Sequence, residues 1–395
     1  MHFNTTLPQP TPDEMELSNH LKHLIKLKIN DEGDISFHDY MEMALYHPQY
    51  GYYTSGIQTI GESGDFITAP EISPLFSQCI AVQYQQILEP YPESELIEIG
   101  AGSGKMCIDL LTVLEKMNAL PSHYYILELS HLLRKNQKIN IEKQIPHLAH
   151  KVQWLDKIEN EFKGIIVANE VLDAMPVNLF KIENNHCLEA YVTHELDQLK
   201  LIHKKSSHNL QIVFNQLLKN GINFEEGYES EINCWAEPWL ATLANNLQQG
   251  VILLIDYGHS QKEYYHPQRS LGTLMNYYRH HTHQNPLIYP GIQDITCHVN
   301  FTQIADSALK LGLNLSGYAN QANFLINCGL LEMNNNQMDI KAQLEFASQI
   351  KKLTLPSEMG EKFKVMSLSK NIQLPLVGFQ SQDILCVKPY HVSHL

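Results

Sequence analysis

Three glycines alternate with other residues in the segment 98-EIGAGSG-104, which stands between an apolar run and a run with helical spacing. Gly100, Gly102 and Gly104 allow a tight backbone turn and a close approach to a ligand. A dinucleotide fingerprint would need its third glycine at position 105, where the chain has Lys. The pattern G-x-x-x-x-G-K-[ST] cannot be aligned on the segment either. The loop therefore fits neither common phosphate-binding pattern.

Acidic residues stand beside this loop and at the ends of later apolar runs. Glu98 precedes the first glycine by two positions, Glu128 lies in 124-YYILEL-129, and Asp156 ends 151-KVQWLD-156. An acidic residue two before G-x-G-x-G resembles motif I of class I S-adenosylmethionine-dependent methyltransferases. In these enzymes the loop passes beside the methionine moiety, and a carboxylate after the second strand accepts both ribose hydroxyls.

We therefore expect S-adenosyl-L-methionine to be the cofactor, with Asp156 near the adenine amino group and Glu98 near the amino end. The alternative for Glu128 is a solvated charge at a strand end, and the alternative for Asp156 is a surface turn. The residues expected to hold the cofactor are Glu98, Gly100, Ala101, Gly102, Gly104, Glu128 and Asp156.

A second group of polar residues follows a fourth apolar run, in 168-ANEVLDAMPV-177. Ligands of open α/β sheets bind at the carboxyl ends of the strands, so Asn169, Glu170 and Asp173 are expected to face the transferred methyl group. Methyl transfer is an in-line displacement that depends on position and electrostatics. If the nucleophile is a guanidinium, carboxylates can hold the cation, bias its charge and accept the released proton. A helix N-cap is the alternative for Asp173.

The elements that would position these residues follow from the apolar pattern. The continuous runs 96–100, 124–128, 165–169 and 251–255 are typical of strands buried on both faces. They alternate with helical runs at 105–117, 131–143 and near 231–247, which implies right-handed crossovers and a mainly parallel sheet. Upstream, Ser36 and Ser73-Pro74 are helix-start signals, and another helix is expected over 19–27. The predicted fold class is α/β.

This pattern predicts additions to one core. We expect an N-terminal helical cap with a cofactor-covering loop over 1–94 and a Rossmann-like methyltransferase core over 95–260, with weaker strands at 186–203. A substrate or cap region is expected as an insertion over 261–360, with helices at 302–311 and 340–352. The C-terminal part, 361–395, would complete the sheet with a hairpin of 363–368 and 383–388.

Composition limits the function. The chain has 395 residues and a formal net charge of −15, which argues against nucleic acid as a partner and leaves room for a cationic substrate. No apolar stretch approaches the roughly 18 residues of a membrane span. The N-terminal residues resemble neither a secretory signal nor a transit peptide, and the seven Cys are scattered singly. We expect a cytoplasmic protein without integral membrane contact.

Several motifs in order resemble the MidA-like family of class I methyltransferases, and the resemblance covers about residues 36–379. The segments that carry it are 37-FHDYMEMALYHPQYGYY-53, 64-GDFITAPEIS-73, 98-EIGAGSG-104, 169-NEVLDAMPV-177, 254-LIDYG-258, 271-LGTLMNYYRHHTH-283, 290-PGIQDITCHVNF-301 and 359-MGEKFKVM-366. Departures are mild, since Ala101-Gly102-Ser103 replaces the more usual Pro-Gly-Arg and Asn300 stands where Asp is frequent.

The resemblance implies a protein arginine methyltransferase that acts on a core subunit of respiratory complex I and aids its assembly. It also implies that 64-GDFITAP-70, with Thr68, closes over the cofactor and that 256-DYG-258 lines the substrate side. A largely non-catalytic assembly factor is an alternative, as is methylation of another protein, a small molecule or RNA. The target arginine, the methylation pattern and the oligomeric state, with a homodimer among the options, stay open.

For most of the remaining candidates we favour a structural role. Arg279, His280, His281 and His283 lack Cys or carboxylate partners at ligand spacing, so no metal is expected. Asp294 is a candidate catalytic residue or a cap. The aromatic cluster at 50–53 is expected to pack rather than to form a cage for a cation.

Overall fold

The computed structural model describes residues 7–56, 68–333 and 339–380. They fall into two compact units, each built from segments that are separated along the chain. The first unit draws on the described residues of 1–66, 173–236 and 261–298, and the second on those of 67–172, 237–260 and 299–395. The chain passes from the second unit to the first between Leu172 and Asp173, inside the segment predicted to be catalytic.

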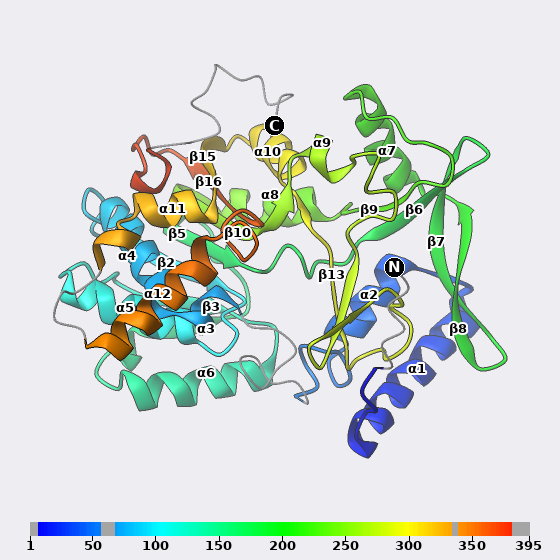
Figure 1. Cartoon of the computed structure of the whole chain (residues 1–395), viewed down its shortest axis with the longest axis horizontal. Helices are drawn as coiled ribbons and strands as arrows, with labels where there is room; N and C mark the ends of the chain where they lie inside the picture. The colour runs from blue at the N-terminus through cyan, green and yellow to red at the C-terminus, as the bar shows by residue number, and fades with distance from the viewer. Residues whose placement is uncertain (1–6, 57–67, 334–338, 381–395) are drawn as a thin grey trace. The chain divides into compact units, whose positions relative to one another are not determined.

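A mixed sheet forms the centre of the second unit (Figure 1). Its strands lie in the order β15-β16-β10-β5-β2-β3-β4. β16 runs antiparallel to β10, and β15 runs antiparallel to β16. The neighbours from β10 to β4 are parallel, as the apolar runs predict. The strands are β2 (Glu95–Ile99), β3 (Tyr124–Leu127), β4 (Val152–Leu155), β5 (Phe162–Asn169), β10 (Leu247–His259), β15 (Asn314–Asn320) and β16 (Phe363–Lys370), and the short β14 (Val299–Asn300) pairs with β10.

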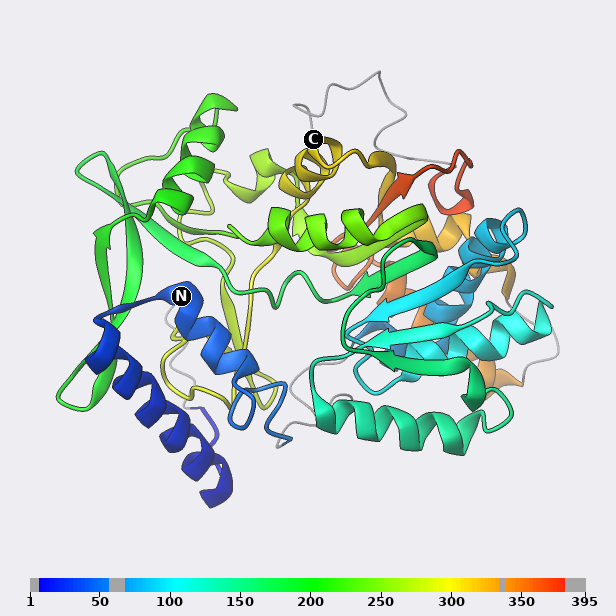
Figure 2. The ribbon, with the colours of Figure 1, turned by 180° about the vertical axis from the view of Figure 1, so that it is seen from behind.

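Helices cover both faces of this sheet. Figure 1 shows α11 and α12 in front of the strands, whereas Figure 2 brings α8 to the front from behind. The buried side chains of α4, α5 and α11 share one hydrophobic cluster with alternate residues of the strands. α4 begins at Pro74 because Ser73 Oγ accepts the N–H of Leu75 at 3.1 Å. The helices are α3 (Ala69–Ile72), α4 (Pro74–Leu88), α5 (Lys105–Lys116), α6 (His131–Gln144), α8 (Ala236–Asn246), α10 (Phe301–Lys310), α11 (Gln321–Asn327) and α12 (Ile340–Thr354).

The first unit contains two small sheets. The five-stranded sheet has the order β1-β7-β6-β9, with β8 paired to β7, and the three-stranded sheet has the order β12-β11-β13. Helices α1, α2, α7 and α9 accompany them, and buried residues of α1 and α2 share a hydrophobic cluster with β7 and β13. The elements are α1 (Pro12–Glu32), β1 (Ile35–Ser36), α2 (Phe37–Tyr46), β6 (Asn178–Glu183), β7 (His186–Glu195), β8 (Gln198–Lys205), α7 (His208–Lys219), β9 (Glu229–Ile232), α9 (Gln261–Tyr264), β11 (Met275–Tyr278), β12 (His281–His283) and β13 (Asp294–Thr296).

The α/β fold class is confirmed, and β2, β3, β4, β5 and β10 form in the segments where the sequence predicts strands. The five-stranded sheet is only partly foreseen, because the sequence indicates strands within 186–203 and misses β6, β9 and α7. On the side away from β10, β16 pairs with β15, which the sequence misses, while the predicted strand 383–388 lies outside the described residues. The predicted domain boundaries stay a prediction, and the compact units cut across them, since 173–236 lies with the described residues of 1–66.

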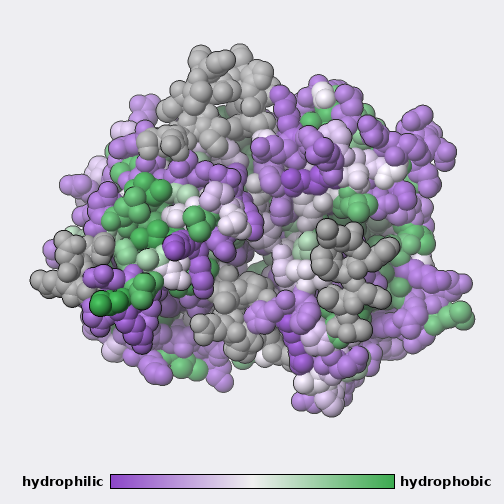
Figure 3. Space-filling model, in the orientation of Figure 1, coloured by the Kyte–Doolittle hydropathy of each residue, from purple (hydrophilic) through white to green (hydrophobic). Residues whose placement is uncertain are grey.

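The polarity of the surface and the composition of the helices are the features that relate to membrane contact. Hydrophilic side chains cover most of the face shown in Figure 3, with hydrophobic groups between them. Two of the most exposed large apolar side chains, Ile340 and Leu344, lie one turn apart on α12. Within the described ranges, no helix combines the length and the apolar character that a membrane crossing needs.

Candidate functional site

The glycine loop joins β2 to α5, where the sequence predicts it. Gly100, Gly102 and Gly104 have φ angles of +68°, +55° and +83°, a left-handed region that favours glycine. A Cβ atom at Gly100 would lie 3.1 Å from Val171 Cγ2, so a side chain there would press on the segment after β5. Ala101 is buried, and its carbonyl accepts the N–H of Gly104 at 2.8 Å.

The loop is also held from α3. Ser103, which replaces the more usual Arg, donates its hydroxyl to Glu71 on α3. Thr68 is the N-cap residue of α3, although its side chain makes no capping hydrogen bond. The predicted covering segment 64–70 is described from Thr68 onward, and its first four residues lie outside the described residues.

Glu98 points into the core rather than to an open surface. Its side chain is 2% exposed, and the hydroxyl of Tyr124 donates to Oε2 at 2.6 Å. Burial raises the pKa of Glu98 to about 7, the hydrogen bond from Tyr124 opposes this shift, and the charge of Glu128 adds to it. Burial raises the pKa of Tyr84, and the charge of Glu98 raises it further. The predicted role of Glu98 at the amino end of the cofactor stays a prediction.

Glu128 follows β3 and is 6% exposed, so the alternative of a solvated charge does not hold. Its Oε1 accepts the backbone N–H of Ser130 at 3.0 Å, and its Oε2 accepts Nε2 of Gln137 at 3.1 Å. Burial raises the pKa of Glu128, while the hydrogen bonds and the nearby Arg134 oppose the shift. A carboxylate has about four lone-pair positions, so these contacts orient the group and leave others for ribose hydroxyls.

Asp156 is exposed, as the alternative of a surface turn predicts. Its side chain is 90% exposed and accepts Arg134 Nη1 at 2.7 Å. Arg134 also donates to the carbonyls of Leu155 at 2.9 Å and Glu128 at 2.5 Å, so it joins the ends of β3 and β4. Nothing in the sequence marks Arg134 beyond its place on a polar helix. The adenine contact of Asp156 stays a prediction.

The end of β5 carries a residue in an unusual conformation. Asn169 is the last residue of β5, and Glu170 after it has a φ of +52° although it is not glycine. The N–H of Glu170 donates to the carbonyl of Ile255 at 2.9 Å, and Asn169 Nδ2 donates to Glu170 Oε1 at 3.2 Å. Such strain is frequent at functional sites and needs surrounding contacts to maintain it.

Asp256 supplies one of these contacts. Its side chain is 1% exposed, and Oδ2 accepts the N–H of Leu172 at 3.0 Å. Oδ1 accepts the N–H of Tyr257 at 2.9 Å. The family resemblance implies that 256-DYG-258 lines the substrate side. In the second unit, Asp256 holds the chain just after Glu170 in place, a role that sequence reasoning missed.

Asp173 is the first residue of its segment of the first unit. Its carbonyl accepts the N–H of Cys297 at 2.9 Å, and the next carbonyl, of Ala174, accepts the Tyr46 hydroxyl at 2.9 Å. Tyr46 stacks on Tyr53 with 5.6 Å between ring centroids.

Tyr53 and Tyr277 complete this arrangement. Tyr53 donates its hydroxyl to Asp294 Oδ1 at 2.9 Å, and Tyr277 pairs with Asp294 in the register of β11 and β13. Burial raises the pKa of Tyr53 and of Tyr277, and the charges of Asp294 and Asp173 raise both further. Asp173 and Asp294 are 5% and 1% exposed. In the first unit, the charges of two buried carboxylates therefore act on the same two tyrosines.

The other candidates have structural positions. Arg279 and His280 form the turn between β11 and β12, and Arg279 pairs with Glu14 at 2.8 Å. Asn300 caps α10 by accepting the N–H of Gln303 at 3.3 Å, a role that the more frequent Asp would also fill. Among the described residues, the group of side chains close enough to share a metal ion is on α2 and consists of His38, Asp39 and Glu42.

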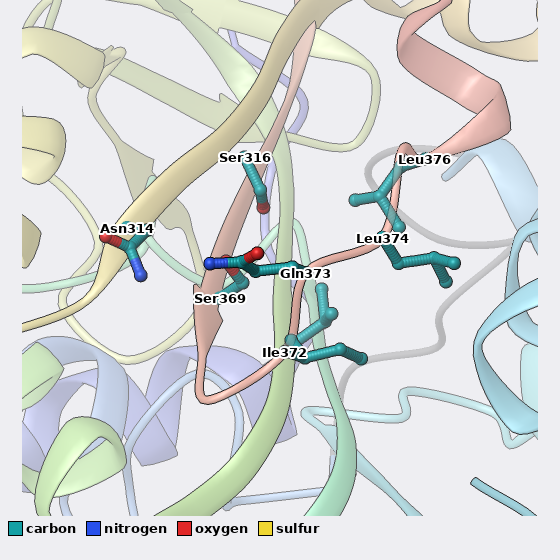
Figure 4. A pocket seen from close by; sticks show the side chains of 8 residues that line it. Asn314, Ser316, Ser369, Ile372, Gln373, Leu374 and Leu376 are labelled. Atoms are coloured by element: carbon teal, nitrogen blue, oxygen red, sulfur yellow. The ribbon is translucent and has the colours of Figure 1, made fainter. Parts of the chain in front are cut away.

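A pocket of about 310 Å³ lies elsewhere in the second unit (Figure 4). Its lining includes Val251 in the first half of β10, Asn314 at the start of β15 and Ser369 near the end of β16. The start of β10 marks the amino ends of the parallel strands, whereas the glycine loop lies at their carboxyl ends. This pocket is therefore not the predicted cofactor site.

Known proteins resemble this chain in sequence and in structure. A family model described as "Putative S-adenosyl-L-methionine-dependent methyltransferase" matches residues 75–319. A crystal structure from Burkholderia thailandensis, bound to S-adenosyl-homocysteine, is similar with a TM-score of 0.89. That protein is 38% identical, and the match covers 96% of this chain and 99% of the other.

More distant relatives are similar over nearly the whole chain. The protein arginine methyltransferase NDUFAF7 of Danio rerio mitochondria is 26% identical, over 92% of this chain and 93% of the relative. The protein of the same name from Homo sapiens is 25% identical, over 90% of this chain and 85% of the relative.

Proposed function

Because this chain belongs to the family of S-adenosyl-L-methionine-dependent methyltransferases that its sequence matches, we propose that it methylates arginine side chains of a protein. S-adenosyl-L-methionine is the cofactor of this enzyme family and supplies the methyl group from its sulfonium. The finer assignment, arginine as the acceptor, is supported by the names of the relatives. The observation that carries it is the pair of buried carboxylates, Asp173 and Asp294.

The residues of the second unit are suited to the cofactor. Three left-handed glycines keep side chains away from the loop after β2, and Glu128 is a buried carboxylate with oriented oxygens. We infer that the loop backbone lies along the methionine part and that Glu128 accepts the ribose hydroxyls. For Glu170, which follows β5, we propose the role of orienting the acceptor nitrogen.

The residues of the first unit are suited to a guanidinium. Oδ1 of Asp294 accepts two hydrogen bonds of 2.9 Å, one from the Tyr53 hydroxyl and one from the backbone N–H of Ile295. These two contacts occupy Oδ1 and restrain the carboxylate, whose negative charge would attract a guanidinium. An acidic pair can also accept the proton that the nitrogen loses on methylation.

For the protein substrate we propose a core subunit of respiratory complex I, on the basis of the family resemblance. The alternative is a factor that aids assembly by binding its partner with little turnover. Cytoplasmic location is part of the same proposal, and fractionation of cells checks it.

The test is mass spectrometry of methylarginine in the proteome with and without the gene, followed by transfer assays on the peptides that change. Glu170→Gln keeps the size of the side chain and should abolish transfer while cofactor binding persists. If arginine methylation is unaltered when the gene is removed, the acceptor is another group. If a folded, cofactor-binding Glu170→Ala chain fully restores complex I assembly, the non-catalytic alternative holds.

A further inference from the structure

Gln137 contacts the glycine loop, Glu128 and β4 at the same time. It stands on α6, which the sequence shows only as a polar helix, and its side chain is fully buried. We propose that Gln137 is a positioning residue that sets the orientation of the Glu128 carboxylate relative to the glycine loop, and so determines how the ribose of the cofactor is bound.

The side-chain amide of Gln137 makes three hydrogen bonds. Its Nε2 donates to the carbonyl of Gly102 at 2.9 Å and to Glu128 Oε2 at 3.1 Å. Its Oε1 accepts the indole Nε1–H of Trp154 at 2.8 Å. Both amide hydrogens and the amide oxygen are thus engaged with a loop, a strand end and a strand that are far apart in the sequence.

Trp154 fixes which way the amide faces. An indole N–H can only donate, so the atom of Gln137 that faces it has to be the oxygen. The NH2 group then necessarily faces the carbonyl of Gly102 and the carboxylate of Glu128. Trp154 on β4 therefore determines the direction of the two donors without touching either acceptor.

The hydrogen bond from Gln137 affects the ionisation of Glu128, whose carboxylate would accept the ribose hydroxyls. Glu128 is buried, and burial alone would favour its neutral form, which cannot accept two hydroxyl donors equally. The hydrogen bond from Gln137 favours the ionised form of Glu128. Together with the N–H of Ser130, it restrains both oxygens and so sets the orientation of the carboxylate plane. The same amide ties this plane to the loop backbone at Gly102.

The neighbouring Asn140 offers a matched control. Its Nδ2 donates to the carbonyl of Ser103 at 3.0 Å, so it contacts the same loop from the same helix. Its hydrogen bond does not involve Glu128. A variant at Asn140 therefore perturbs the loop alone, whereas a variant at Gln137 perturbs the loop and the carboxylate together.

The experiment measures calorimetric dissociation constants of the full chain for S-adenosylhomocysteine and for its 2′-deoxy analogue. The wild type should lose affinity when the hydroxyl is removed. In Gln137→Leu we expect binding of the parent compound to weaken about tenfold or more, since hydrogen bonds to a buried charged group are lost. The penalty for the deoxy analogue should then shrink at least threefold, because Glu128 is no longer oriented.

Asn140→Ala should weaken both compounds by the same factor and leave the deoxy penalty as in the wild type. If Gln137→Leu does not fold, Gln137→Met gives a side chain of similar length without donors and is measured in the same way. A deoxy penalty that is unchanged in a folded Gln137 variant would overturn the proposal, because Gln137 would then contribute only to packing. These binding measurements need no methyl acceptor, so they stand apart from the proposed arginine specificity.

Discussion

Tyr53 donates its hydroxyl to Oδ1 of Asp294 across 2.9 Å and joins the segment after α2 to β13. Burial and the charge of Asp294 raise the pKa of Tyr53, so the phenol keeps its proton and stays a donor. Asp294 is thereby held in one orientation inside the first unit. This makes Asp294 more than the cap that its sequence position also allowed, and its role can be separated from cofactor binding.

Asp294→Asn should reduce methyl transfer by about 100-fold or more, within the usual contribution of a positioned acid–base group. Asn has nearly the same shape but cannot hold a guanidinium as an anion or take its proton. Affinity for S-adenosylhomocysteine should change little, because the predicted cofactor residues are all in the second unit. Transfer assays and calorimetry check both expectations, and a variant with normal turnover would leave Asp294 without a catalytic role.

Glu98 should make stability depend on pH. Its pKa is about 7 in the folded protein, above its ordinary value of 4.5, so the folded state binds this proton more tightly. The contribution is therefore fully present below pH 4.5 and is lost as the pH rises through 7. At 1.36 kcal/mol per pKa unit, the loss is about 3 kcal/mol.

Glu98→Gln should remove this dependence in the cofactor-free protein, because Gln does not titrate. Urea unfolding at pH 5 and pH 8 measures the effect as the difference between wild type and variant. The difference isolates Glu98 from other titrating groups. Parallel pH profiles for the two proteins would contradict the shifted pKa.

Gly102→Val should abolish binding of S-adenosylmethionine. A β-branched residue at a φ of +55° is strained by about 1–2 kcal/mol, and its side chain would stand in the loop that the ligand approaches. Gly221→Val is the control, since Gly221 also has a positive φ, of +83°, and a Cβ atom added there would have no neighbour within 4 Å. It should lose similar stability and keep binding. If the two variants bound S-adenosylmethionine equally well, the glycine loop would not be part of the cofactor site.

Asp156→Ala should cost at most about 1 kcal/mol of stability, because its ion pair with Arg134 is exposed on the Asp156 side. If Asp156 contacts the adenine amino group, affinity for S-adenosylhomocysteine falls several-fold, and the loss is absent for an analogue with hypoxanthine in place of adenine. Calorimetry with both compounds decides. An equal loss for the two bases would indicate a merely structural pair with Arg134.

The sequence predicts the second unit well because its strands are continuous apolar runs that bury both faces. β2, β3, β5 and β10 could be recognised locally, and so could the loop that ends at Gly104. The five-stranded sheet resists such prediction. β1 has only two residues, Ile35–Ser36, and pairs with β7 more than 150 positions later, so nothing local marks it as a strand.

The site shows the same limit. The residue types at Glu128 and Glu170 could be chosen from the sequence because a carboxylate after a buried strand stands out. The contacts of Gln137 could not, although its spacing of four from the buried Ile141 indicates the inward face of α6. The left-handed conformation of Glu170 has no sequence signal, since non-glycine residues seldom adopt it.

That conformation leads to a prediction about the balance of stability and activity. Glu170 has a φ of +52°, which costs an ordinary residue about 1 kcal/mol and glycine nothing. Glu170→Gly should therefore stabilise the protein by up to about 1 kcal/mol. The higher conformational entropy of glycine in the unfolded chain reduces this gain. Methyl transfer should be lost, because the carboxylate is gone.

Glu170→Ala separates the two effects, since it removes the carboxylate and keeps the strain. We expect it to be as inactive as Glu170→Gly but no more stable than the wild type in urea unfolding. If Glu170→Ala retained most of the activity, the carboxylate would not act on the acceptor. If Glu170→Gly were less stable than Glu170→Ala, the strain would be compensated locally, because the bond from the Glu170 N–H to Ile255 and the Asp256 contact to Leu172 would then hold the backbone at no net cost.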